Sequence, residues 1–229
     1  MNTPITIILD TETTTNKASP ERPLEVIELA WIDANNQAVM GQARFKPRMP
    51  SAFGALATHH ILMEELEGCR PSAEAPGVPP LSAYWIGHNI DFDWQALGSP
   101  EGISRICTLA LARKLFPACD SHSLTAVTYY VLGATKEIRE LVKYAHGAMV
   151  DCLLVTKILP TLMEQAGAST WEALWHASEE ARIPEIMPFG KHFGRPVSAV
   201  DRGYALWYKK LPDADPYIIR AFQRAGLLR

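Results

Sequence analysis

The apolar and polar positions near the start of the chain predict strands that follow one another directly. Residues 5–9, ITIIL, are β-branched and apolar on both alternating faces, which is typical of a central strand covered on both sides. LEVIELAWID at 24–33 and AVMGQARFKP at 38–47 also have strand character. Polar and Pro-containing segments separate the three runs, so we expect hairpin connections between them.

Further along the chain, the pattern changes to strands that alternate with helices. MEELEG at 63–68 has a helical pattern, residues 71–80 form a Pro-rich surface segment, and AYWIG at 83–87 predicts a fourth strand. Helical periodicity then continues to about residue 165, in LALARKLF, SLTAVTYYVLG and VDCLLVTKILPTLM. We therefore expect an α/β fold in which helices flank a mixed sheet.

A change of composition near residue 180 predicts a second, smaller domain. After a helical stretch at 170–182, the segment IPEIMPFGKHFGRP combines glycine and proline with basic and aromatic residues. We expect a main domain at 1–180 and a small C-terminal module at 181–229. The aromatic residues of this module are interpreted first as its core, because so short a segment has little else to bury; base stacking is the alternative.

Charge is distributed unevenly, although the formal net charge of the 229 residues is only −3. From Arg182 to the end, nine Lys and Arg stand against four Asp and Glu, so the remainder of the chain is acidic. Such an asymmetry favours a nucleic-acid partner. Within the basic segment, we expect Lys191 and Arg195 to contact phosphates.

The sequence predicts a cytoplasmic protein with no membrane partner. No apolar run approaches the ~20 residues of a membrane helix, and MNTPITIILD lacks the basic region of a signal peptide. The four cysteines are scattered without a CxxC pair, which argues against a zinc site or a disulfide framework. We expect reduced, structural thiols.

Two carboxylates close the first predicted strand. Asp10 and Glu12 are two residues apart, so their side chains point to the same face. A third acid, Asp151, lies in the apolar stripe of a predicted helix, together with Val155, Ile158 and Leu162. A charge there is costly unless it is paired or binds a metal. The alternative is that Asp151 lies close enough to the helix start to reach water and to be favoured by the helix dipole.

A fourth acid comes from HNIDFD, where the fourth strand ends and a helix begins. Asn89 is the expected N-cap of this helix, and Asp91 is interpreted as a first-turn charge that complements the helix dipole. Asp93 is then the better candidate for a metal ligand. Four acids from separate elements, with no Cys or His cluster, indicate a site for a hard cation such as Mg²⁺ or Mn²⁺.

A histidine precedes Asp151 by five residues. If Gly147 lies before the helix start, His146 can fold back toward the acids and accept a proton from an attacking water. His88 precedes Asp93 with the same spacing, but it ends an apolar strand, where structural hydrogen bonds are expected. We therefore favour His146 as the general base.

Taken in order, these residues resemble the motifs of the DEDDh exonuclease family: DTET at 10–13, HNxxFD at 88–93 and HxxxxD at 146–151. VIELA at 26–30, HHI at 59–61 and ICTLALARKLFP at 106–117 are also similar to the family. The segment from MPFGKHFGRPVSAV to GYALWYKKLP resembles the module that ends bacterial exodeoxyribonuclease X, a branch that acts on DNA 3′ ends.

The resemblance implies a ribonuclease-H-like mixed sheet of five strands flanked by helices. It also implies a 3′–5′ exonuclease in which two Mg²⁺ ions, replaceable by Mn²⁺, bind Asp10, Glu12, Asp93 and Asp151, with His146 as general base. The expected partners are single-stranded or duplex DNA 3′ ends, with RNA and a homodimer as further possibilities. Residues within or beside the motifs are expected to contact the substrate: Thr11, Thr13, His59 and Asn89.

Three alternatives stay open at this point. A ribonuclease of the same family has the same catalytic set, and only the C-terminal module favours DNA. An aspartyl phosphatase also has an apolar strand that ends in an acidic motif, but Glu12 occupies the third position here. The last alternative is a catalytically silent nucleic-acid-binding protein, which the five filled chemical positions disfavour.

Overall fold

The computed structural model describes residues 5–229. They form two compact units, the first extending to Trp175 and the second running from His176 to Arg229. The division falls inside helix α7 (Trp171–Ala181), a little before the boundary predicted at residue 180. The composition of the chain changes only after this helix ends, so composition alone places the boundary later.

The first unit contains a six-stranded mixed sheet in the order β4-β3-β2-β1-β5-β6. Strands β1, β2 and β3 pair antiparallel, whereas β5 pairs parallel to both β1 and β6. The strands are β1 (Ile5–Thr13), β2 (Val26–Asp33), β3 (Met40–Lys46), β4 (Arg70–Pro71), β5 (Ser82–Gly87) and β6 (Ser104–Cys107). The predicted mixed α/β fold is confirmed. The sheet has six strands and not five; the pattern did not predict β4 and β6, which have two and four residues and are too short to leave a periodic signal.

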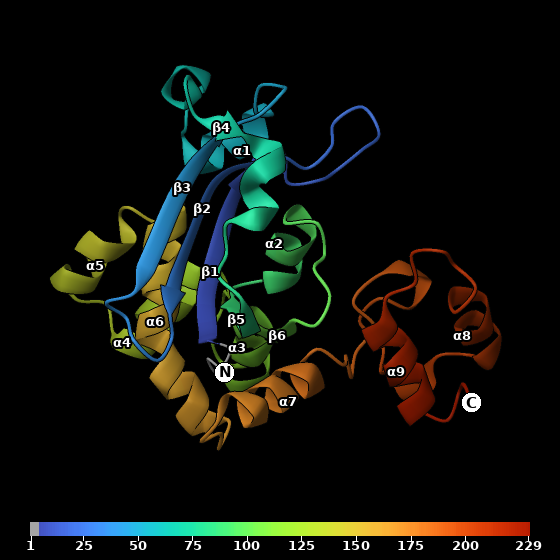
Figure 1. Cartoon of the computed structure of the whole chain (residues 1–229). Helices are drawn as coiled ribbons and strands as arrows, with labels where there is room; N and C mark the ends of the chain where they lie inside the picture. Colours follow the sequence, from blue (N-terminus) through green and yellow to red (C-terminus); the bar gives the residue numbers. More distant parts are fainter. Residues whose placement is uncertain (1–4) are drawn as a thin grey trace. The chain divides into compact units, whose positions relative to one another are not determined.

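Helices flank this sheet (Figure 1). In the first unit they are α1 (Phe53–His59), α2 (Ile90–Ala96), α3 (Thr108–Leu115), α4 (Leu124–Leu132), α5 (Lys136–Val142) and α6 (Ala148–Gln165). MEELEG, expected to be helical, forms only a short 3₁₀ turn, η1 (Met63–Leu66), in which the Glu65 carboxylate accepts a hydrogen bond from the backbone N–H of Leu62. No helix of residues 5–229 is long and apolar enough to cross a membrane.

The core of the first unit surrounds β1. Ile7, Ile8 and Leu9 are almost fully buried, as expected for a strand covered on both faces. Helix α6 packs against β1 and β2, and the predicted stripe of Val155, Ile158 and Leu162 is buried in that interface. This packing fixes the start of α6 relative to the carboxyl end of β1.

The second unit has its own small core. After the end of α7 it contains two 3₁₀ turns, η3 (Gly190–His192) and η4 (Val197–Ala199), and the helices α8 (Arg202–Tyr208) and α9 (Pro216–Arg224). Tyr204, Tyr208 and Phe222 are buried among aliphatic side chains, so much of the aromatic content forms the core, as first interpreted. Phe193 and Trp207, in contrast, are 73% and 54% exposed.

Candidate active site

Three of the predicted acids converge at one end of the sheet. Asp10 and Glu12 lie two residues apart on β1, and Asp151 lies in the first turn of α6. One carboxylate oxygen from each lies within 4.8 Å of the other two. Because α6 packs on β1 and β2, the fold brings together residues that are far apart in the sequence.

Asp93 joins this cluster from α2. Its carboxylate is 3% exposed, and its Oδ1 accepts hydrogen bonds from the backbone N–H of Thr11 at 2.9 Å and from the Thr11 hydroxyl at 2.7 Å. Thr11 lies between Asp10 and Glu12, so these bonds fix Asp93 beside both. Asp91 instead receives a hydrogen bond from Arg105 at 2.5 Å and is only partly buried.

The four acids share an environment that disfavours their charged forms. Burial, followed by the charges of Asp93 and Asp151, raises the pKa of Asp10 well above its ordinary value. Burial and the neighbouring acids raise the pKa of Glu12 to about 8. Burial also raises the pKa of Asp93, to about 7, although its hydrogen bonds from Thr11 act in the opposite direction. The pKa of Asp151 is likewise raised by burial.

This electrostatic pattern fits a divalent cation. Crowded, buried carboxylates repel one another, and a bound positive charge removes that repulsion. The donors are all carboxylate oxygens, which suits a hard cation rather than zinc or copper. Asp10, Glu12 and Asp151 can supply oxygens to one ion, and Asp93 lies close enough to Asp10 to extend the site.

A fifth acid, Glu28, was missed by the sequence analysis. It lies opposite Glu12 in the β1–β2 register and is 2% exposed. Its Oε1 accepts a hydrogen bond from Arg44 Nε at 2.8 Å, and its Oε2 accepts one from the backbone N–H of Ala148 at 3.1 Å. Glu28 thus ties β3 to the first residue of the helix that carries Asp151. A charged residue within the apolar run VIELAWID was the available signal.

His146 lies just before helix α6, because Gly147 precedes the first helical residue, as predicted. Gly147 is the N-cap of α6, and His146 is exposed with a left-handed φ of 70°. Its backbone N–H donates to Asp151 Oδ1 at 3.1 Å, which supports a conformation that is uncommon for a residue with a side chain. The two motif residues are therefore in direct contact.

His88 has the structural role expected for it. Its Nδ1 lies 3.1 Å from Thr108 Oγ1, and its Nε2 lies 2.8 Å from the backbone oxygen of His122. Burial lowers the pKa of His88 to about 4, so the ring is neutral near pH 7. Both of its ring nitrogens are engaged within the protein.

Some of the residues predicted to contact the substrate in the first unit already use their polar groups within the protein. The hydroxyls of Thr11 and Thr13 are committed to Asp93 and to the backbone oxygen of Thr15. Asn89 occupies the predicted N-cap position, but its side chain makes no capping bond, because a φ of 77° takes its backbone out of the usual N-cap conformation. Asn89 is thus the N-cap residue of α2, as predicted, although without a capping bond from its side chain, and its contact with the substrate stays a prediction.

Among the residues predicted to contact the substrate, His59 has a ring nitrogen that makes no hydrogen bond to the described residues. It is 6% exposed, and its Nδ1 accepts a hydrogen bond from the backbone N–H of Ile61 at 2.9 Å. Nδ1 is therefore unprotonated, and Nε2 carries the proton. Within residues 5–229, this buried Nε2 has no hydrogen-bond partner. A buried donor without a partner is costly, so a ligand acceptor at this position would be stabilising.

Lys191 and Arg195 belong to the second unit, where both are exposed. Lys191 Nζ lies 3.5 Å from Asp201 Oδ2. Contact of these two residues with phosphates stays a prediction.

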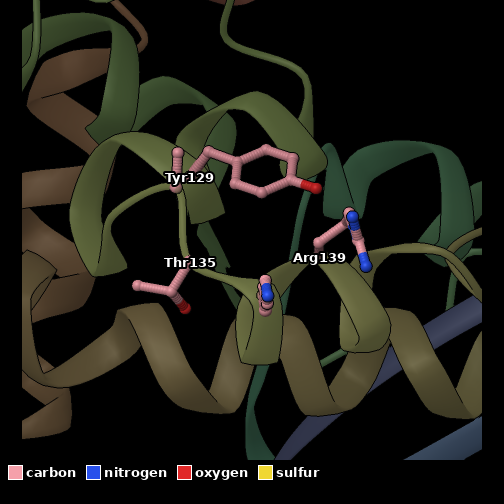
Figure 2. Close-up of a pocket in the computed structure, with 5 residues that line it drawn as sticks. Tyr129, Thr135 and Arg139 are labelled. Carbon is pink, nitrogen blue, oxygen red and sulfur yellow. The ribbon is translucent and has the colours of Figure 1, made fainter.

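A hollow between α4 and α5 is also separate from the acidic cluster (Figure 2). It has a volume of about 340 Å³ and is lined by Tyr129, Ala134, Thr135, Lys136 and Arg139. The lining contains none of the acids; Thr135, Lys136 and Arg139 are exposed, and Tyr129 is half-buried. We assign no chemistry to this hollow.

Comparison with solved structures places the fold among exonucleases, whereas no protein-family model and no curated protein matches the sequence. A structure of exonuclease X in complex with 5′ overhanging duplex DNA matches with a TM-score of 0.59 and 24% identity, over 76% of this chain and 99% of that one. Escherichia coli exonuclease I in complex with a dT13 oligonucleotide matches with a TM-score of 0.53 and 16% identity, over 72% of this chain and 42% of that one. Exonuclease I from Methylocaldum szegediense matches with a TM-score of 0.53 and 18% identity, over 78% and 43%.

These likenesses define the fold class. The chain has the ribonuclease-H-like fold of exonucleases, as the motifs implied. Its similarity to exonuclease X extends over nearly all of that chain and leaves about a quarter of the present chain unmatched. The match covers less than half of each exonuclease I chain.

Proposed function

We propose that this protein is a metal-dependent 3′–5′ exonuclease that hydrolyses DNA from 3′ ends and releases nucleoside 5′-monophosphates. The observation that carries the proposal is the cluster of Asp10, Glu12 and Asp151, with carboxylate oxygens within 4.8 Å of one another. Asp93 is held beside them by Thr11. An acidic site of this kind, on a fold shared with exonucleases, is best explained by phosphoryl transfer.

The four carboxylates are proposed to hold two Mg²⁺ ions, with Mn²⁺ as a substitute. Ions bound there would stabilise the attacking and leaving oxygens of an in-line displacement. The protein contributes a rigid arrangement, because Asp10 and Glu12 come from a central strand and Asp151 from a helix packed on it. Asp10→Ala is therefore expected to abolish activity without unfolding the protein.

His146 is proposed as the general base that accepts the proton of the attacking water. Its exposed ring lies at the start of α6, with its backbone bonded to Asp151. Histidine is the side chain most often used to accept a proton from a reacting group. Its exposure leaves room for a water and a substrate phosphate.

Two further features support a DNA substrate. The structures similar in fold include exonucleases bound to duplex DNA with a 5′ overhang and to single-stranded DNA. In addition, the chain from Arg182 to its end carries nine Lys and Arg against four Asp and Glu. We propose that His59 contacts the substrate through its unpartnered Nε2, and that Lys191 and Arg195 contact phosphates.

The experiment that tests this proposal is a parallel digestion of single-stranded DNA, duplex DNA and RNA of the same sequence in Mg²⁺. We expect both DNA substrates to be shortened from the 3′ end and RNA to be cut more slowly. Glu67→Gln is the matched control for Asp10→Ala, because Glu67 is an exposed acid paired with Lys46. Preferential RNA digestion would identify a ribonuclease, and no digestion of any substrate would contradict nuclease function.

A further inference from the structure

We propose that the second unit carries its own binding site for single-stranded DNA, in a groove around Trp207. The groove has a volume of about 370 Å³ and is lined by Lys191, Asp201, Gly203, Tyr204 and Trp207. We call it the Trp207 groove. The inference extends the proposed exonuclease function by adding a second point of contact with the DNA.

The aromatic wall of the groove has a rigid support. Tyr204 is buried, with its ring 6.4 Å from Phe222 and 6.4 Å from Tyr208 between centroids. Trp207 leans on it, with ring centroids 5.2 Å apart, yet keeps 54% of its surface exposed. An exposed indole supported by a packed core offers a base a stacking surface that is already ordered.

Lys191 places a cation in the groove, and Lys210 follows Trp207 in the sequence. Lys191 lines the groove, with Nζ 5.1 Å from the centroid of the Tyr204 ring. Gly203, Trp207 and Lys210 follow at intervals of four and three residues, so they lie along one face of α8 and its final turn. Lys210 is exposed, and its backbone N–H bonds to the Trp207 oxygen. A strand whose base stacks on Trp207 therefore has the Lys191 ammonium group available for a phosphate in the same groove.

Asp201 organises the groove without closing it. Its Oδ1 accepts a hydrogen bond from the backbone N–H of Tyr204 at 2.8 Å and caps α8, while its Oδ2 lies 3.5 Å from Lys191 Nζ and 3.2 Å from His192 Nε2. The Lys191–Asp201 pair is more than half exposed on both sides. Such a pair is weak, so Lys191 can exchange Asp201 for a phosphate.

Gly203 lines the groove and, having no side chain, leaves space in it. It is the second residue of α8, in its first turn. The only atom that a Cβ at this position would approach within 4 Å is Asp201 Oδ1, at 3.2 Å. The rest of the space above it is open, which lets a strand approach the helix backbone.

Charge and shape together favour a single strand as the occupant. From His176 to Arg229 the unit carries nine Lys and Arg against six Asp and Glu. Aromatic faces bind unstacked bases, whereas the bases of a duplex are stacked on one another and do not offer their faces. A second site on the same chain would also raise the effective concentration of the strand at the acidic cluster.

The test uses the full-length chain in EDTA, where binding is measured without cleavage. Binding of fluorescent single-stranded DNA by Trp207→Ala should weaken by about tenfold, the loss expected for one stacked base. Trp207→Phe should retain most of the affinity. The matched control is Leu206→Ala, because Leu206 is 45% exposed on the same helix but does not line the groove.

Two further readouts separate this inference from the proposed function. Lys191→Gln should reduce the slope of log affinity against log salt by about one. Nuclease activity in Mg²⁺, measured separately for wild type, reports on the acidic cluster and not on the groove. Equal DNA binding by Trp207→Ala, Trp207→Phe, Leu206→Ala and wild type would overturn the groove, even if the protein is an active nuclease. A tenfold loss in a protein without nuclease activity would support the groove and contradict the exonuclease proposal.

Discussion

Thr11 donates two hydrogen bonds to a single oxygen of Asp93, one from its backbone and one from its hydroxyl. Both bonds favour the ionised carboxylate, which burial disfavours. Thr11 thus has a structural reason to lie between Asp10 and Glu12: it holds the fourth acid in place. The role first expected for Thr11, contact with the substrate, would compete with this pair of bonds.

The first prediction follows from this pair. Thr11→Val removes the hydroxyl bond, so the pKa of Asp93 should rise further above about 7. The acidic limb of the pH profile of kcat/KM should then move to higher pH, with activity near pH 7 lower by about tenfold. Thr11→Ser keeps the hydroxyl and should leave the limb in place. Equal pH profiles for Thr11→Val and Thr11→Ser would show that the hydroxyl bond does not change the pKa of Asp93.

The second prediction concerns the stability of the metal-free protein. Glu12 and Asp93 have folded pKa values of about 8 and about 7, above their ordinary values of 4.5 and 3.8. Raised pKa values mean that the folded state holds protons more tightly, so this contribution to stability is full at low pH and is lost as the pH rises through the folded values. In EDTA, the Tm should fall by roughly 5 °C between about pH 5.5 and about pH 8.

Mg²⁺ should reverse that loss at the upper end of the range, because a bound cation stabilises the ionised acids. Asp10→Asn is the matched variant, since it removes one charge from the cluster and should flatten the dependence in EDTA. Thermal unfolding followed by circular dichroism, with and without Mg²⁺, makes both comparisons. A Tm that is insensitive to Mg²⁺ at about pH 8 would argue against a cation site.

The third prediction concerns Glu28. Glu28→Ala leaves the backbone N–H of the buried Ala148 without its acceptor and Arg44 without a buried partner. We expect a loss of about 2–3 kcal/mol in the free energy of unfolding, measured by urea denaturation. Because the start of α6 carries Asp151, kcat should also fall by about tenfold or more.

Two variants show whether this effect is specific. Glu28→Gln retains an oxygen for the Ala148 N–H and should recover part of both losses. Lys46→Ala removes an exposed ion pair with Glu67 and should cost only about 0–1 kcal/mol. If Glu28→Ala were as mild as Lys46→Ala, Glu28 would not anchor the helix.

The fourth prediction tests the general base. His146→Ala should lower kcat by about 10²–10⁴, with little change in KM, because the base acts on the attacking water. His176→Ala, an exposed histidine of the second unit, serves as the control. An unchanged kcat for His146→Ala would discard its role as base.

Much of the fold was predictable because its signals are local. The apolar run before Asp10 and the stripe on α6 each follow from the periodicity of one element, and both were confirmed. The strand β4 and the 3₁₀ turn η1 were missed or mistaken, because two- to four-residue elements depend on their neighbours rather than on a repeat.

For the candidate site, sequence reasoning found the acids but not what holds them. The two-residue spacing of Asp10 and Glu12 predicted that their side chains share one face of a strand. Asp151 was selected because a charge in an apolar helical stripe is costly unless it is paired or binds a metal. The bond from Thr11 to Asp93 joins residues 82 positions apart, and the bond from Ala148 to Glu28 spans 120. Such contacts arise only when strands and helices pack, so periodicity cannot predict them.

The most direct test of the proposed function follows the digestion of a 5′-labelled single-stranded DNA over time in Mg²⁺, with wild type and Asp151→Asn compared. Asp151→Asn keeps the shape of the side chain and an acceptor for the His146 N–H but removes the charge. The proposal predicts a ladder that shortens step by step from the 3′ end with wild type, release of nucleoside 5′-monophosphates, and no shortening with the variant. Loss of the label in the first products, cutting of a circular substrate, or equal digestion by both proteins would contradict it.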